Sequence, residues 1–144
     1  AKMLGARKSL TIVTNSIMAV AELMESGHRL IVVGGEFRKL SRTLVGPLTA
    51  QTIGTLKIQK AFLGTIGFTA EDGISTTDPG EAFTKELIMK RSEKVYLLAD
   101  SSKLGKSSLA VSGNIGDIDV IITDRGIQAA LEKDLIKKKI KIVK

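Results

Sequence analysis

The sequence predicts an α/β domain of three layers, in which a mostly parallel sheet has helices on both faces. Two observations predict this fold class. Residues 30–33 and 95–99 are apolar at every position, as in strands that are buried on both sides. Segments with apolar residues at helical spacing separate such runs, and parallel strands need crossovers of this kind. The 144 residues suit one domain, so we predict a single domain over residues 1–144.

The first half of the chain is predicted to alternate strands and helices. A first helix is capped by Asn15 or Ser16 and ends at Gly27. Pro47 suits the first turn of a second helix, and residues 34–46 before it are expected to be irregular. The strands that surround these helices are predicted at residues 10–13, 30–33 and 61–63.

The strongest helix start lies in the second half. Asp78 is the predicted N-cap, Pro79 the first helical residue and Glu81 the reciprocal capping acid of a helix that ends near Arg91. The glycine-punctuated residues 64–77 before it are expected to form a loop. The remaining predicted elements are strands at 95–99 and 120–122, a helix from Asp124 to Leu131, and an edge strand at 139–143.

The composition excludes several classes of chemistry. Without cysteine there is no disulfide scaffold, thiolate chemistry or zinc ribbon, and one histidine, His28, disfavours a transition-metal site. Neither a GxGxxG fingerprint nor a Walker loop occurs, so no cofactor is expected. Aromatic residues make up 3% of the chain, which disfavours base stacking on nucleic acid. No targeting or membrane-spanning segment is found, so we expect a cytoplasmic location and no membrane partner.

The formal charge of +7 favours a polyanion or a phosphorylated small molecule as partner. Residues 137–144 contain five of the lysines, and the rest of the chain is therefore nearly balanced. A run of this kind is usually a solvated face or a protected edge strand. Direct binding of this tail to nucleic acid would be weak and salt-sensitive, because no base-reading element accompanies it.

Small and polar residues follow each predicted strand. Ligands of open parallel sheets bind at the carboxyl ends of the strands, so we expect these residues to gather along one edge. Amides and lysines suit a phosphate, and acids and asparagine suit hydroxyl groups, which together favour a phosphorylated polyol. Simpler roles remain open, such as a cap at residues 15–16, a turn at 34–35 and an exposed Glu81–Lys85 ion pair. The polar segments are residues 14–16, 34–36, 64–65, 100–103 and 123–124.

A series of short motifs runs through the chain: Thr-Asn-Ser at 14–16, Gly-Gly-Glu-Phe-Arg at 34–38, Val-Gly-Pro at 45–47, Lys-Ala-Phe-Leu-Gly at 60–64, Asp-Gly-Ile-Ser-Thr at 72–76, Glu-Ala at 81–82 with Lys85, Ala-Asp-Ser-Ser-Lys-Leu-Gly at 99–105, and Asp-Ile-Asp at 117–119 with Ile-Thr-Asp at 122–124. These motifs occur in the same order as in the C-terminal sensor domain of DeoR-type bacterial transcription repressors, which the chain resembles from about residue 11 to residue 123. No single motif is decisive, but the ordered set is specific.

The resemblance implies a fold akin to ribose-5-phosphate isomerase and the coenzyme A transferases, and a role in sensing phosphorylated sugars. In the family a winged helix-turn-helix precedes this domain and binds operator DNA. That module and the family's first strand, with its phosphate loop, are expected before residue 1, because residues 1–8 resemble the tail of a helix. The ligand-facing positions that the resemblance implies are Asn15, Gly34, Gly35, Lys60, Glu81, Lys85, Asp100 and Lys103.

The favoured function is therefore a non-catalytic effector sensor, which is expected to form a homo-oligomer because operator recognition requires fixed half-site spacing. The alternative is a sugar-phosphate isomerase. Its chemistry needs a carboxylate base, Asp100 or Glu81, and a donor to the enediolate, Lys85 or Lys103. The identity of the sugar phosphate does not follow from these residues.

Overall fold

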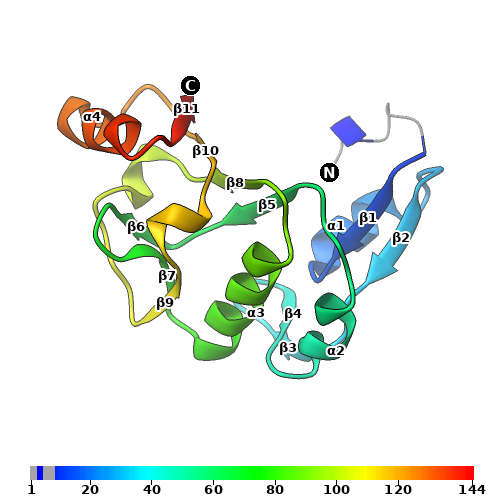
Figure 1. Ribbon diagram of the computed structural model, residues 1–144. Coiled ribbons are helices and arrows are strands. Elements are labelled where there is room, and N and C mark those ends of the chain that lie inside the picture. Colours follow the sequence, from blue (N-terminus) through cyan, green and yellow to red (C-terminus); the bar gives the residue numbers. More distant parts are fainter. Residues whose placement is uncertain (1–2, 5–8) are drawn as a thin grey trace.

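The computed structural model describes residues 3–4 and 9–144 (Figure 1). The predicted helix tail at residues 1–8 falls largely outside these described residues. Within these described residues the chain forms two parallel sheets and two antiparallel ones. In Figure 1 the small parallel sheet lies at one side of the molecule and the C-terminal helix at the other.

The larger parallel sheet has four strands in the order β11-β10-β8-β5. Its strands are β5 (Ala61–Gly64), β8 (Val95–Leu98), β10 (Val120–Ile122) and β11 (Lys141–Val143). Leu63, Leu97 and Ile121 stand side by side in register and are buried. The mixed α/β class with a mostly parallel sheet is thus confirmed, while Phe62 and Leu98 of the opposite face are exposed.

One apolar core lies against the buried face of this sheet. Helices α3 (Pro79–Lys90) and α4 (Ala129–Lys137) contribute Met89 and Leu135 to it. Phe68 and Ile74 enter the same core from the antiparallel sheet described below. These side chains are buried completely or nearly so, and they pack the two helices and the antiparallel sheet against the four-stranded sheet.

The second parallel sheet pairs β1 (Thr11–Thr14) with β2 (Arg29–Val32), and α1 (Ile17–Leu23) connects them. Ser16 is the N-cap of α1, since its Oγ accepts a hydrogen bond of 3.3 Å from the amide of Ala19. Both strands and this cap were predicted correctly. The helix ends four residues before Gly27, at a C-cap formed by Met24.

Four short strands lie where the sequence predicted irregular chain, and a fifth lies within residues 104–119, for which no element was predicted. A hairpin pairs β3 (Glu36–Arg38) with β4 (Thr43–Val45), and a three-stranded antiparallel sheet joins β6 (Gly67–Thr69), β7 (Gly73–Thr76) and β9 (Ala110–Gly113). Strands of three or four residues are too short to show a period of two. Gly73 adopts φ +78°, and a Cβ there would lie 2.1 Å from the carbonyl oxygen of Gly113, so this site requires glycine.

Two helix starts differ from the prediction. Helix α2 (Thr49–Gly54) begins after Leu48, so Pro47 precedes the helix instead of forming its first turn. Helix α4 begins at Ala129 and not after Asp124, because the Asp124 carboxylate accepts hydrogen bonds from the amides of Ser101 and Gly126. The Asp78 cap and Pro79 at the start of α3 are as predicted.

The lysine-rich tail forms the edge strand β11, which pairs with β10 in parallel. The prediction of an edge strand at residues 139–143 is confirmed for Lys141–Val143. Lys138 Nζ donates to the carbonyl oxygen of Ala70 at 2.8 Å, and Lys144 pairs with Glu132 at 2.8 Å. Among the described residues, no helix has both the length and the apolar character that crossing a bilayer requires.

Candidate functional site

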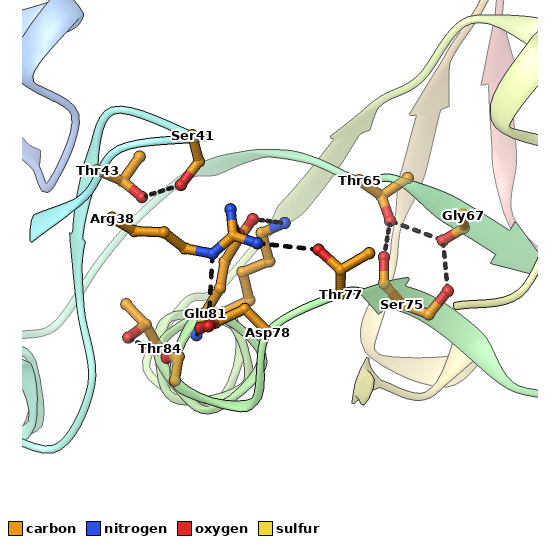
Figure 2. A network of polar contacts seen from close by, with 12 residues as sticks. Arg38, Ser41, Thr43, Thr65, Gly67, Ser75, Thr77, Asp78, Glu81 and Thr84 are labelled. Atoms are coloured by element: carbon orange, nitrogen blue, oxygen red, sulfur yellow. Dashed lines mark hydrogen bonds and ion pairs between the residues drawn. The ribbon is translucent and has the colours of Figure 1, made fainter. Parts of the chain in front are cut away.

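A network of charged side chains surrounds the N-terminus of α3, and we call it the Arg38 network (Arg38, Thr77, Asp78, Glu81 and Lys85). Arg38 Nε lies 3.5 Å from Asp78 Oδ2, and Arg38 Nη1 lies 3.4 Å from Glu81 Oε2. Arg38 Nη2 donates to Thr77 Oγ1 at 2.9 Å. Lys85 Nζ lies 2.7 Å from Glu81 Oε1, one helical turn along α3. Figure 2 shows Arg38 reaching from the hairpin across the first turn of α3.

Three of the five side chains of the network are largely buried, while Thr77 is exposed and Asp78 is 35% exposed. The side chains of Arg38 and Lys85 are each 14% exposed and that of Glu81 is 10% exposed. Arg38 Nη1 and Glu81 Oε2 lie within ion-pair distance, yet neither makes a hydrogen bond to any described residue. A buried polar atom without a partner costs about 1–3 kcal/mol. The network therefore contains a hydrogen-bond donor, Arg38 Nη1, and an acceptor, Glu81 Oε2, that lie side by side without a hydrogen bond.

The Glu81 prediction needs correction. Its amide does receive the hydrogen bond of the Asp78 cap, at 2.7 Å. Its carboxylate, however, pairs with Lys85 and Arg38 and does not return to the N-cap as a capping box requires. The Glu81–Lys85 ion pair, which was the simpler role expected for these residues, is present. It is buried and not exposed, because the hairpin covers it.

Close backbone contacts hold the hairpin against α3. The amide of Gly46 donates to Thr84 Oγ1 at 3.0 Å, and Thr84 Oγ1 donates to the carbonyl oxygen of Gly80 at 2.8 Å. Gly35 has φ +152°, and a Cβ there would lie 2.7 Å from the carbonyl oxygen of Val45. A glycine at position 35 is therefore needed to bring the chain into β3, where Arg38 begins its reach.

The carboxyl end of β5 lies next to this network. Thr65 follows β5 and its hydroxyl is placed to donate to the carbonyl oxygens of Gly67 at 2.6 Å and Ser75 at 2.9 Å. Ser75 lies in β7, two residues before Thr77 of the Arg38 network, and Figure 2 shows the two groups in one view. Helix α3, which carries Glu81 and Lys85, contacts both β5 and β7.

The turn after β8 carries two more predicted residues, Asp100 and Lys103. Asp100 accepts hydrogen bonds from the amide of Ser102, at 2.9 Å, and from its hydroxyl. The side-chain hydrogen bond from Ser102 lowers the pKa of Asp100 below its ordinary value of 3.8. Asp124, after β10, accepts from the amides of Ser101 and Gly126, and these bonds lower its pKa as well.

The backbone amides of the turn after β8 are not available to bind an anion, because they already donate hydrogen bonds within the protein. The amides of Ser101 and Ser102 donate to the two carboxylates, and that of Lys103 donates to the carbonyl oxygen of Asp100. The Lys103 ammonium pairs with no carboxylate among the described residues, so it is the cation that this turn offers to a ligand.

A cavity of about 300 Å³ adjoins the same turn, at the lower limit of small-molecule sites. It contains two carboxylates, those of Glu71 and Asp134, but no lysine or arginine. Such a lining does not suit a phosphate. It is formed by Thr69, Ala70, Glu71, Ser101, Leu104, Gly105, Gly126, Gln128, Leu131 and Asp134.

The other predicted site residues lie apart from these groups or have structural partners. Asn15 Nδ2 donates to the carbonyl oxygen of Leu44 at 2.9 Å, which ties α1 to the hairpin. Gly34 is exposed, with open space where a Cβ would stand. Lys60 is exposed and precedes β5, so it lies at the amino ends of the parallel strands, opposite to the edge with Asp100. The expected single edge therefore does not include Lys60.

Arg38 was not among the residues predicted for the site, although it belongs to the Gly-Gly-Glu-Phe-Arg motif at residues 34–38. Arg38 could have been identified if the sequence had shown that it lies in the first strand of a β-hairpin. Because residues 34–46 were expected to be irregular, nothing indicated that Arg38 would face the start of α3, 40 residues further along the chain.

The fold and this arrangement define a mixed α/β domain whose polar side chains gather around the first turn of α3 and the neighbouring strand ends. A family model described as the DeoR C terminal sensor domain matches residues 1–125. The chain therefore belongs to the DeoR C-terminal sensor domain family, as its motifs suggested.

Similar proteins include three bacterial regulators. One is the "Uncharacterized HTH-type transcriptional regulator YulB" of Bacillus subtilis, 34% identical over 92% of this chain and 52% of its own length. Another is the "Transcriptional repressor AccR" of Agrobacterium fabrum, 35% identical over the same shares. A third is the "Lactose phosphotransferase system repressor" of Staphylococcus epidermidis, 32% identical over 87% of this chain and 51% of its own. The chain spans about half the length of these relatives.

Proposed function

We propose that this chain is the effector-binding domain of a DeoR-type transcription repressor and that it binds a phosphorylated sugar without transforming it. The observation that carries the proposal is the gathering of charged and hydroxyl side chains at the start of α3 and at the ends of β5 and β8, in a member of a sensor-domain family. A relative named as a repressor of a lactose phosphotransferase system supports a sugar-related effector.

The ligand would be bound by groups of two kinds. Carboxylates and the cations paired with them exchange hydrogen bonds with sugar hydroxyls, and an unpaired ammonium attracts a phosphate. Glu81 and Lys85 belong to the first group, and Lys103 to the second. Asp100 shapes the turn that carries Lys103. Asn15, Gly34 and Gly35 remain predicted ligand residues of this proposal, which leaves out Lys60 because it lies at the amino ends of the parallel strands.

Two observations favour sensing over isomerisation. A catalytic base must be free to take a proton, but the Glu81 carboxylate is paired with two cations. Asp100 is a weak base, because its hydrogen bonds lower its pKa. We therefore expect no turnover of ribose 5-phosphate or hexose phosphates in an isomerase assay, and turnover above background would favour the isomerase alternative.

In this proposal the operator is bound by a helix-turn-helix segment outside this chain, in a cytoplasmic homo-oligomer. The effector acts by binding one conformation of the repressor more tightly than another, and coupling of this kind is typically about 1–3 kcal/mol.

The test is a thermal-shift screen of the chain against ribose 5-phosphate, glucose 6-phosphate, fructose 1-phosphate and glycerol 3-phosphate, followed by calorimetry. A ligand that binds only the folded state raises Tm. We expect at least one compound to do so, and Lys103→Ala to weaken its binding. Lys106→Ala, a nearby exposed lysine, is the matched control. Failure of every sugar phosphate in the panel to bind would contradict the proposed function.

A further inference from the structure

The β3–β4 hairpin connects two parts of the molecule. On one side it is bound to the start of α1 through the main chain: the amide of Ile17 donates to the carbonyl oxygen of Arg42 at 3.0 Å, and that of Leu44 donates to the carbonyl oxygen of Asn15 at 2.8 Å. On the other side, the amide of Gly46, directly after β4, donates to Thr84 Oγ1 of α3 at 3.0 Å, and the Arg38 side chain of β3 pairs with Glu81 of α3 and with its N-cap Asp78. The β4 end is thus held through the main chain, while β3 is held on α3 through the contacts of the Arg38 guanidinium group.

These contacts are incomplete. Arg38 Nη1 and Glu81 Oε2 face each other at 3.4 Å without a hydrogen bond, and both atoms are buried. Glu81 as a whole is 8% exposed. The free donor and the free acceptor are complementary to one chemical group, a hydroxyl, whose oxygen accepts from Nη1 while its hydrogen donates to Oε2.

We propose that Arg38 and Glu81 form a subsite for a sugar hydroxyl and that its occupation shifts the β3–β4 hairpin on α3. Both atoms are buried, so a ligand hydroxyl reaches them only when Arg38 and Glu81 move apart from their present contact at 3.4 Å. Glu81 is fixed on a helix of 12 residues, whereas Arg38 is on a three-residue strand. The separation therefore moves the hairpin, together with its main-chain bonds to α1.

The charges of the Arg38 network indicate which part of the ligand it takes. Two cations, Arg38 and Lys85, face two carboxylates, those of Asp78 and Glu81, so the formal charges cancel. A phosphate dianion gains no net attraction from such a group and meets two carboxylates at close range, that of Glu81 being buried. A neutral hydroxyl needs no net electrostatic attraction and is not repelled by the carboxylates. The subsite rests on the proposed function, while the control of the hairpin by Arg38 does not.

The first part of the test needs no ligand. Because the chain has no cysteine, Lys39→Cys on the hairpin and Lys90→Cys at the end of α3 allow two spin labels to be placed uniquely. Arg38→Lys keeps the charge but loses the planar fork that contacts Asp78, Glu81 and Thr77 together. We expect it to broaden the distance distribution between the labels. The control is Arg42→Lys on the same hairpin, whose exposed side chain contacts Met18 Sδ at 3.5 Å. Equal distributions in both variants would overturn the hairpin claim.

The second part compares ribose 5-phosphate and the other sugar phosphates of the panel with inorganic phosphate by calorimetry. We expect Arg38→Lys to weaken sugar-phosphate binding about tenfold or more and to leave the affinity for inorganic phosphate unchanged. Thr77→Val, which removes only the hydroxyl that Arg38 contacts, gives a milder loss. Sugar-phosphate binding that Arg38→Lys retains would overturn the subsite alone. Absence of binding by the unsubstituted chain would overturn the proposed function and the subsite with it, while the label distances still decide the hairpin claim.

Discussion

Two aspartates begin helical segments in this domain, and their surroundings differ. Asp78 caps α3 and lies beside Arg38 in a network that is mostly buried. Asp100 caps the 3₁₀ turn Ser101–Lys103 and is exposed. At α3 the charges are paired and fixed by packing, while at the turn after β8 one ammonium, that of Lys103, stays unpaired among the described residues. From this difference we expect stability to depend on the first region, and the proposed binding of an anion to depend on the second.

The largest expected effect comes from removing the central cation. Arg38→Met leaves Glu81 buried with one cation instead of two, and breaking a buried pair is strongly destabilising. We expect the free energy of unfolding in urea to fall by about 2–4 kcal/mol, since Lys85 still compensates part of the charge. Arg42→Met, the exposed arginine of the same hairpin, should change it by less than about 0.5 kcal/mol. Equal losses in the two variants would show that the buried network has no special weight.

A second effect separates two adjacent glycines at the entry to the hairpin. Gly35→Ala forces a Cβ to within 2.7 Å of the carbonyl oxygen of Val45, and we expect a loss of about 1–3 kcal/mol. Gly34→Ala meets open space and should be nearly neutral. Urea unfolding of both variants measures the difference. If Gly34→Ala were the more damaging one, the described approach of β3 to β4 would be incorrect.

A third prediction compares the two caps directly. Asp78→Ala removes the acceptor for the amide of Glu81 and should cost about 1 kcal/mol of unfolding free energy. Asp100→Ala should have a smaller effect, because water replaces its hydrogen bonds at an exposed turn. Thermal unfolding followed by circular dichroism ranks them, and the reverse order would contradict the assignment of stability to α3.

The smallest effect is a dependence on pH. Hydrogen bonds lower the pKa values of Asp100 and Asp124 in the folded state, so each contributes stability above the ordinary value of 3.8 that is lost as the pH falls through the folded pKa. Urea unfolding between about pH 5 and pH 2 should show this loss, and Asp124→Asn should reduce its slope. An unchanged slope would mean that the bonds to Ser101 and Gly126 do not form in solution.

Much of the parallel framework was predictable from sequence. Residues 95–99 and 120–122 are apolar runs bounded by polar residues, and the Asp78-Pro79 pair marks a helix start through its own local chemistry. Where local signals were weak, prediction failed. Strand β9 pairs with β7 more than 30 residues earlier, and the periodicity of a four-residue strand does not reveal such a partner.

The candidate site was predictable in part for the same reason. Glu81 and Lys85 lie in α3 and Asp100 follows β8, as the sequence indicated, while their role as ligand residues stays a prediction. Arg38 was not selected, because its role depends on a hairpin that no periodicity predicted. Lys60 was carried over from the family motif, and the strand register places it at the opposite edge. Whether Arg38 and Lys60 lie at the candidate site depends on contacts between segments distant in sequence, which the residue types alone do not indicate.

The most direct test of the central claim is an NMR titration of the ¹⁵N-labelled chain with the sugar phosphate that stabilises it most. The account predicts that the largest shift changes fall on the amides of residues 77–82 and 100–103 and on the hairpin at 36–45. Changes confined to the amino ends of the strands, near Lys60 and Lys94, would contradict it.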